Sequence, residues 1–254
     1  MIRKLQAAID ANEPVVLATV VATRRSVPRH PGTKMLVYAD GRIEGTIGGG
    51  EMEHRVKLEA AAALEDGESR LLAYSLVDPA DGDPGVCGGE AEIFLEPYMP
   101  HPQLFVIGAG HVGTAVGELG HWLGFRTVVW DDRPELVAVA EASDAVDSAA
   151  TGPISEFVAS QTIGANDSIV IVTRNVALDL ELLPVLLGTN ALYVGLMGSQ
   201  RRWDTTRERL AELGVDEASM GRVQAPIGIE IAAETPAEIA VSILAEVIAQ
   251  RRGA

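Results

Sequence analysis

Apolar and polar positions follow two different periods in the first hundred residues of this 254-residue chain. Short apolar runs rich in β-branched residues predict five strands, at 15–22, 34–38, 42–47, 70–77 and 91–96. Apolar residues at helical spacing predict a weak helix at 2–11 and a stronger helix at 51–65. Asp40-Gly41 between two of the strands is a typical hairpin turn. These elements predict an α+β domain.

The rest of the chain alternates strands with helical stretches. Four strands are predicted, at 103–107, 126–130, 168–173 and 191–195. Helices are predicted after the first of these strands to about residue 123, at 199–213, and after the capping box Thr235–Glu238. This alternation is typical of a Rossmann-like, doubly wound parallel sheet. Prolines at 97, 100 and 102 stiffen the connection, so we expect domains at 1–100 and 101–254.

Composition and charge narrow the class of protein. Hydrophobic residues make up 47% of the chain, which is enough for packed cores, and the longest apolar runs are only strand-length. The first twelve residues lack the apolar core of a signal peptide, so we expect a cytoplasmic protein. A net charge of −16 argues against binding to nucleic acid or to an anionic membrane.

Two windows without acidic residues interrupt this negative charge. The first lies between Glu13 and Asp40 and contains Arg24, Arg25, Arg29 and Lys34. The second lies between Glu181 and Asp204 and contains Arg201 and Arg202. Each window is either a pocket for an anionic ligand or a solvated loop, and the sequence leaves both interpretations open.

A dinucleotide fingerprint follows the strand at 103–107. Gly108, Gly110 and Gly113 have the Gly-x-Gly-x-x-Gly spacing, in which the glycines allow a tight turn, approach of a pyrophosphate and close packing of the helix. Asp131 ends the next strand, where a carboxylate accepts hydrogen bonds from a ribose and repels a 2′-phosphate, although Arg133 weakens the second inference. The spacing predicts NAD(P)-type binding or, alternatively, a Rossmann-like domain that has lost its ligand.

A second glycine turn, of a different design, lies at the start of the helix predicted at 51–65. Gly48, Gly49 and Gly50 place backbone N–H groups at the positive end of that helix, where they can hold an anion. Glu51 follows them and also compensates the helix dipole. A tight connection between packed elements is the alternative interpretation.

The only cysteine, Cys87, precedes Gly88 and Gly89 in a loop. A single cysteine excludes an intramolecular disulfide and a cysteine-based zinc site. It is either a buried structural residue or a thiol that faces a ligand, where a thiolate can bind a soft metal or carry sulfur. The sequence shows no Ser-His-Asp set, histidine pair or P-loop lysine motif, so an oxidoreductase would lack an obvious proton donor.

Taken together, these motifs resemble the xanthine dehydrogenase accessory family, XdhC/CoxI. The resemblance covers nearly the whole chain, and its specificity comes from the joint order of the segments. They are Ser26–Arg29 with Gly32, Thr46–Glu53, Cys87–Gly89, Leu104–Gly113, Asp131–Pro134, Tyr193–Ser199, Ala225–Gly228 and Thr235–Ile243.

The resemblance implies a maturation chaperone rather than an enzyme. Members of this family bind the molybdenum cofactor, protect it, assist its sulfuration and deliver it to an apo molybdenum hydroxylase. The cofactor is a pterin carrying a phosphate or, in some bacteria, a dinucleotide. A sulfur-transferring desulfurase and a second copy of the chain are the further partners implied. The positions assigned to the cofactor in the first domain are Arg29, Lys34, Gly48–Gly50 and Cys87.

The chain departs from the family pattern in two places. Arg25 precedes Ser26, where relatives often have glycine, and Val176 replaces a histidine in a Thr-x-x-His-x-x-Asp pattern. Arg174 lies at the carboxyl end of a predicted strand, where doubly wound sheets bind their ligands, and supplies positive charge there. An NAD(P)-dependent oxidoreductase and a nucleotide-sensing regulatory module remain the alternative functions.

Overall fold

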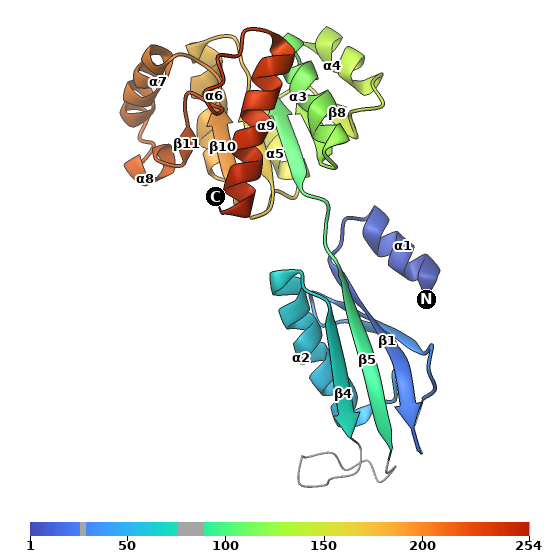
Figure 1. Ribbon diagram of the computed structural model, residues 1–254. Helices are drawn as coiled ribbons and strands as arrows, with labels where there is room; N and C mark the ends of the chain where they lie inside the picture. Colours follow the sequence, from blue (N-terminus) through green and yellow to red (C-terminus); the bar gives the residue numbers. More distant parts are fainter. Residues whose placement is uncertain (26–28, 76–88, 254) are drawn as a thin grey trace. The chain divides into compact units, whose positions relative to one another are not determined.

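The computed structural model describes residues 1–25, 29–75 and 89–253 (Figure 1). The chain divides into two compact units, Met1–Pro100 and His101–Ala254. Cys87 and Gly88, both predicted site residues, lie outside the described residues. In the part of the chain that is described, no helix is both long and apolar enough to cross a bilayer.

The first unit is built on one antiparallel sheet with the strand order β3-β2-β1-β5-β4. Its strands are β1 (Val15–Arg24), β2 (Lys34–Tyr38), β3 (Ile43–Gly45), β4 (Arg70–Ser75) and β5 (Glu90–Tyr98). Each strand lies close to a predicted one. The predicted α+β class of this unit is therefore confirmed.

Two helices supply the apolar partners of this sheet, α1 (Ile2–Asp10) and α2 (Gly50–Asp66). Successive residues of a strand point to opposite faces, and both faces of β1 are buried. Val16 and Ala18 belong to a core with Val56 of α2, whereas Leu17 belongs to a separate core with Leu5 of α1. The alternation along β1 thus explains why the sheet needs both helices.

The second unit has a parallel six-stranded sheet with the order β11-β10-β9-β6-β7-β8. The order counted from β6 is the classic Rossmann order, so the predicted fold is confirmed. The strands are β6 (Gln103–Ile107), β7 (Arg126–Trp130), β8 (Ser148–Ala150), β9 (Ser168–Ile171), β10 (Tyr193–Leu196) and β11 (Val223–Gln224). The sequence pattern does not predict β8 and β11, which have only three and two residues.

Helices cover both faces of this sheet. Val116 and Val247 pack in one core, and Phe157, Leu182 and Leu210 pack in the other. The predicted capping box at the start of the last helix is present. The helices are α3 (His111–Trp122), α4 (Pro134–Glu141), α5 (Ile154–Ser160), α6 (Val176–Leu187), α7 (Gln200–Glu212), α8 (Glu217–Met220) and α9 (Pro236–Arg252).

Two of the segments that carry the family resemblance are explained by packing. Gly195 lies under Ile227, and a Cβ at Gly195 would lie 2.4 Å from Ile227 Cδ1. The Tyr193 hydroxyl donates to Glu246 of α9, which also accepts from the Gly228 amide at 2.8 Å. Burial, followed by this contact with Glu246, raises the pKa of Tyr193. Segments 193–199 and 225–228 thereby attach α9 to the sheet.

Candidate functional site

The fingerprint loop between β6 and α3 needs two of its three glycines for packing. Gly108 has φ +120°, and a Cβ there would lie 2.9 Å from the Val172 carbonyl oxygen. A Cβ at Gly113 would lie 1.8 Å from the Gly108 carbonyl oxygen, because α3 packs directly on the loop. These two glycines follow from the fold and are not by themselves evidence of a ligand.

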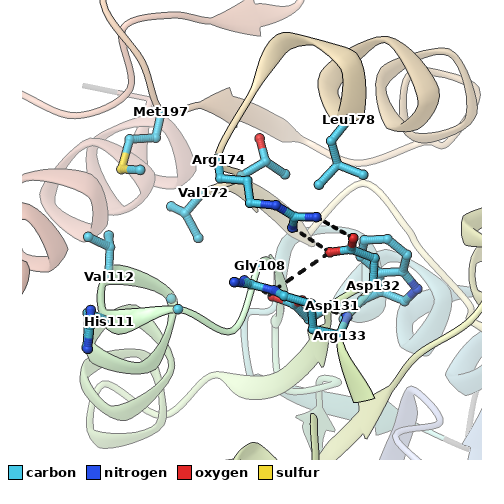
Figure 2. Close-up of a pocket in the computed structure, with 14 residues that line it drawn as sticks. Gly108, His111, Val112, Asp131, Asp132, Arg133, Val172, Arg174, Leu178 and Met197 are labelled. Atoms are coloured by element: carbon cyan, nitrogen blue, oxygen red, sulfur yellow. Dashed lines mark hydrogen bonds and ion pairs between the residues drawn. The ribbon is translucent and has the colours of Figure 1, made fainter. Parts of the chain in front are cut away.

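Gly110 is different, because nothing in the described protein requires a glycine there. It is the N-cap of α3 with φ −74°, and a Cβ would meet no atom within 4 Å. The first N–H groups of a helix have no partner within the helix, and no side chain caps α3 among the described residues. The open space belongs to a pocket of about 240 Å³ at the carboxyl end of the sheet (Figure 2). This arrangement is suited to an anion.

Asp131 lies beneath this pocket, with 1% of its surface exposed. Its carboxylate accepts from the Ala109 amide at 2.7 Å and from Arg133 Nε and Nη2 at 2.8 and 2.9 Å. Burial raises the pKa of Asp131, but the bonds from Arg133 and Ala109 outweigh it and lower the pKa to about 2. This carboxylate ties the glycine loop to β7, and its predicted contact with a ribose stays a prediction.

A second ion pair crosses the pocket. Arg174, which follows β9, donates to both carboxylate oxygens of Asp132, which follows β7, at 2.7 and 2.6 Å (Figure 2). Arg174 thus supplies positive charge at the predicted edge, but Asp132 already balances it. Asp132 is not among the predicted site residues, although its position next to Asp131 at the end of a strand is a usable signal.

In the second acid-free window, Arg202 is neither a free cation of a pocket nor part of a solvated loop. Arg202 donates from Nε and Nη2 to the fully buried Asp179, at 2.9 and 2.7 Å, and from Nη1 to the Thr173 carbonyl. A buried carboxylate needs such a partner. Arg202 is therefore a structural cation, and the Thr173 and Asp179 of the family pattern are its partners. Val176, in place of the family histidine, begins α6.

The triple-glycine turn of the first unit also differs from the expectation. Gly48, Gly49 and Gly50 all have positive φ, at 141°, 80° and 67°. Two of the three glycine amides expected to be free donate inside the turn, Gly48 to the Thr46 hydroxyl at 3.2 Å and Gly49 to Glu53 at 2.8 Å. The Ile47 amide also donates to Glu53, at 3.1 Å. Burial raises the pKa of Glu53, but these bonds and one from Thr46 outweigh it and lower the pKa.

The remaining predicted residues of this unit have mixed surroundings. Glu51 pairs with Arg55 on α2 at 3.1 Å. Lys34 Nζ donates to the Thr19 hydroxyl at 3.0 Å, and Arg29 is exposed. Gly89 is buried immediately before β5.

Strand pairing brings several of these residues to one end of the sheet. Lys34 begins β2 and pairs with Thr19, and Gly45 ends β3 and leads into the glycine turn. Glu90 begins β5 opposite Arg24, which ends β1, so Gly89 emerges toward the same end but five positions beyond Thr19 along β1. Among residues 1–25, 29–75 and 89–253, no three His, Cys, Asp or Glu side chains gather as metal ligands.

Comparison with protein families gives two matches. Residues 104–247, more than half of the chain, match the XdhC Rossmann domain. Residues 8–75 match the XdhC and CoxI family. A crystal structure titled as a xanthine dehydrogenase from Bacillus halodurans covers 99% of this chain and 96% of its own, with a TM-score of 0.53 and 22% identity. At that identity the likeness shows the fold alone.

Three curated relatives differ in length. Protein YqeB of Escherichia coli is 35% identical over 96% of this chain, which covers 45% of YqeB. The molybdenum cofactor insertion chaperone PaoD of E. coli is 27% identical over 96% of this chain and 86% of PaoD. A probable xanthine dehydrogenase subunit of Bacillus subtilis is 29% identical over 63% of this chain and 46% of that protein. The chain therefore spans about half the length of two of these relatives and most of PaoD.

Proposed function

Because the chain belongs to the XdhC/CoxI family, we propose that it binds the molybdenum cofactor and helps to insert it into a molybdenum hydroxylase such as xanthine dehydrogenase. The observation that carries this proposal is the similarity to PaoD, which runs through both units and covers 86% of that chaperone. In this role the cofactor is cargo, and the chain's task is to hold it and release it.

We place the cofactor at the end of the first sheet where Lys34, Gly48–Gly50 and Gly89 emerge. A phosphate group is attracted by cations such as Lys34 and Arg29 and by the positive end of α2. The thiolate of Cys87 is a soft ligand of the kind that binds a metal centre. Because Glu53 already holds two amides of the turn, the phosphate would contact the start of α2 or displace that carboxylate.

The test loads the purified full chain with molybdenum cofactor and measures the molybdenum retained per protein. We expect Cys87→Ala and Gly49→Asp to retain less than the wild type. Gly41→Asp is the matched control, because Gly41 has nearly the same φ, +81° against +80°, and open space around it, but lies in the turn at the opposite end of the sheet. Equal retention by all four proteins would remove this site.

The proposal extends to steps that the family relationship implies. The chain would support sulfuration of the cofactor with a sulfur-transferring desulfurase as partner, and it would act as a homodimer in the cytoplasm. Transfer of labelled sulfur from a desulfurase to the bound cofactor tests the first step. Sedimentation of the purified chain tests the dimer.

A second candidate function rests on the open space at Gly110, which favours a nucleotide in the second unit. That function is either an NAD(P)-dependent oxidoreductase or a nucleotide-sensing module. Titration with NADH and NADPH, with binding measured by fluorescence, is the first step in separating the oxidoreductase from the sensing module. Substrate-dependent turnover supports the enzyme, and a change of oligomeric state without turnover supports the sensor.

A further inference from the structure

The two ion pairs at the fingerprint pocket are held with different firmness. Asp131 is almost completely buried and accepts from both Arg133 and the Ala109 amide. The side chains of Asp132 and Arg174 are 32% and 46% exposed and are joined by two hydrogen bonds, and Asp132 also lies 3.9 Å from Arg133 Nε. Exposed ion pairs add little net stability, so opening this second pair costs little.

The position of the exposed pair matters more than its strength. Strands β7 and β9 are the two neighbours of β6, so a bridge from Asp132 to Arg174 passes over the loop that follows β6. Figure 2 shows the two side chains meeting on one side of Gly108, with His111 and Val112 at the start of α3 on the other side. In doubly wound sheets, a diphosphate group lies over this loop.

We propose that the Asp132–Arg174 ion pair is an exchangeable latch over the glycine loop, and that a ligand carrying a diphosphate group opens it by taking Arg174 from Asp132. The proposal goes beyond cofactor insertion, because it concerns any ligand with that group. Either a nicotinamide dinucleotide or a dinucleotide form of the pterin cofactor would provide it.

The chemistry of exchange favours the phosphate over the carboxylate. A guanidinium binds either group through two parallel hydrogen bonds, so Arg174 can change partner without losing that geometry. The phosphate gains further donors at the start of α3, which Asp132 does not reach. The backbone beside Arg174 is held in place, because Asn175 caps α6 by accepting from the Leu178 amide at 3.0 Å. The exchange that we propose therefore requires only the Arg174 side chain to move.

Calorimetric titration of the full chain with ADP at low salt tests this latch. Asp132→Asn removes the competing charge and should tighten ADP binding about threefold. Arg174→Gln should weaken ADP binding about tenfold, and Arg174→Lys, which keeps the charge but not the paired bonds, should weaken it less. Arg207→Gln is the control, because Arg207 pairs with Glu217 on α8, away from this pocket. Thermal melts establish that each variant is folded.

Three results would overturn the latch. They are unchanged or weaker ADP binding by Asp132→Asn, unchanged binding by Arg174→Gln, and no ADP binding by either the wild type or Asp132→Asn at millimolar concentration. Parallel titrations with NAD⁺, GDP and CDP separate the two sources of the diphosphate, since tighter binding of NAD⁺ than of ADP indicates a nicotinamide dinucleotide. Molybdenum retention by Arg174→Gln is measured separately, so failure of the latch is distinguished from failure of the cofactor-binding role.

Discussion

The two glycine-rich turns of this protein join a strand to a helix, yet their backbone amides have different fates. In the turn before α2, Ile47 and Gly49 donate to Glu53, a residue of the same turn and helix. In the loop before α3, Ala109 donates to Asp131, which comes from the next strand. The first turn is closed by a local carboxylate, whereas the second is tied to its sheet. Both turns keep open space at the helix end, since a Cβ would meet no atom within 4 Å at Gly49, Gly50 or Gly110.

The reason for glycine also differs between the turns. Gly48, Gly49 and Gly50 have φ values that L-residues rarely adopt, so backbone conformation alone requires them. Gly110 has an ordinary φ of −74° and no neighbour that a Cβ would meet. A glycine that neither conformation nor packing requires is the stronger sign of a ligand. On this ground we regard the second loop as the candidate for a diphosphate-bearing ligand, separate from the cofactor site proposed at the first turn.

The largest expected effect on stability comes from comparing two single substitutions in the second loop, each of which adds one methyl group. Gly113→Ala should lower the free energy of unfolding by about 3 kcal/mol, because its Cβ would overlap the Gly108 carbonyl oxygen. Gly110→Ala should lower the free energy of unfolding by less than about 1 kcal/mol, because its only expected effect on stability is that alanine is a poorer N-cap than glycine. Urea denaturation of both variants measures the difference.

Nucleotide titration of the same two variants completes this test. Gly110→Ala should stay folded and lose ADP binding, because the new methyl group occupies the space beside the first N–H groups of α3. A Gly110→Ala variant that binds ADP like the wild type would show that the open space is not a ligand site. The contrast drawn between the two turns would then be lost.

An intermediate effect is expected from the carboxylate that ties the second loop to β7. Since the pKa of Asp131 is lowered from 3.8 to about 2, its contribution to stability is complete above the ordinary pKa and is lost as pH falls from about 4 to 2. The full contribution is about 2 kcal/mol at pH 7, of which about half remains at pH 3. Asp131→Asn should be less stable by that amount at pH 7.

Urea denaturation at pH 7, 5 and 3 measures this contribution. The stability difference between the wild type and Asp131→Asn should shrink as the pH is lowered. A difference that stays constant across this range would mean that the carboxylate is not held by Arg133 and Ala109 as the structure shows.

Local patterns were sufficient to predict much of the fold. The buried strands β6 and β7 and the capping box of α9 are encoded within a few consecutive residues, and all three were predicted. The short strand β8 is only half-buried, and α4 and α5 have eight and seven residues, so their apolar periodicity is weak. Those elements require the whole sheet to define them.

The charged groups of the site were harder to predict, because their partners are distant in sequence. Arg174 and Asp132 are 42 positions apart, and Arg202 and Asp179 are 23 apart. Each pair forms only when the strand order brings the carboxyl ends of β7 and β9, or α6 and α7, together. The spacing of residues identified the glycine loop, but it carried no information on which carboxylate each arginine contacts.

The smallest expected effect concerns the local carboxylate of the first turn. Glu53→Gln removes the charge that accepts from Ile47, Gly49 and Thr46 and should cost about 1 kcal/mol at pH 7, because the side chain is only half-buried. Since the pKa of Glu53 is lowered, this cost should disappear as pH falls through that pKa. Glu65→Gln, at an exposed position of α2, is the control. If Glu53→Gln instead retains more molybdenum cofactor than the wild type, the cofactor's phosphate competes with Glu53 for the amides of the turn. The first turn would then be as good a candidate for phosphate binding as the second.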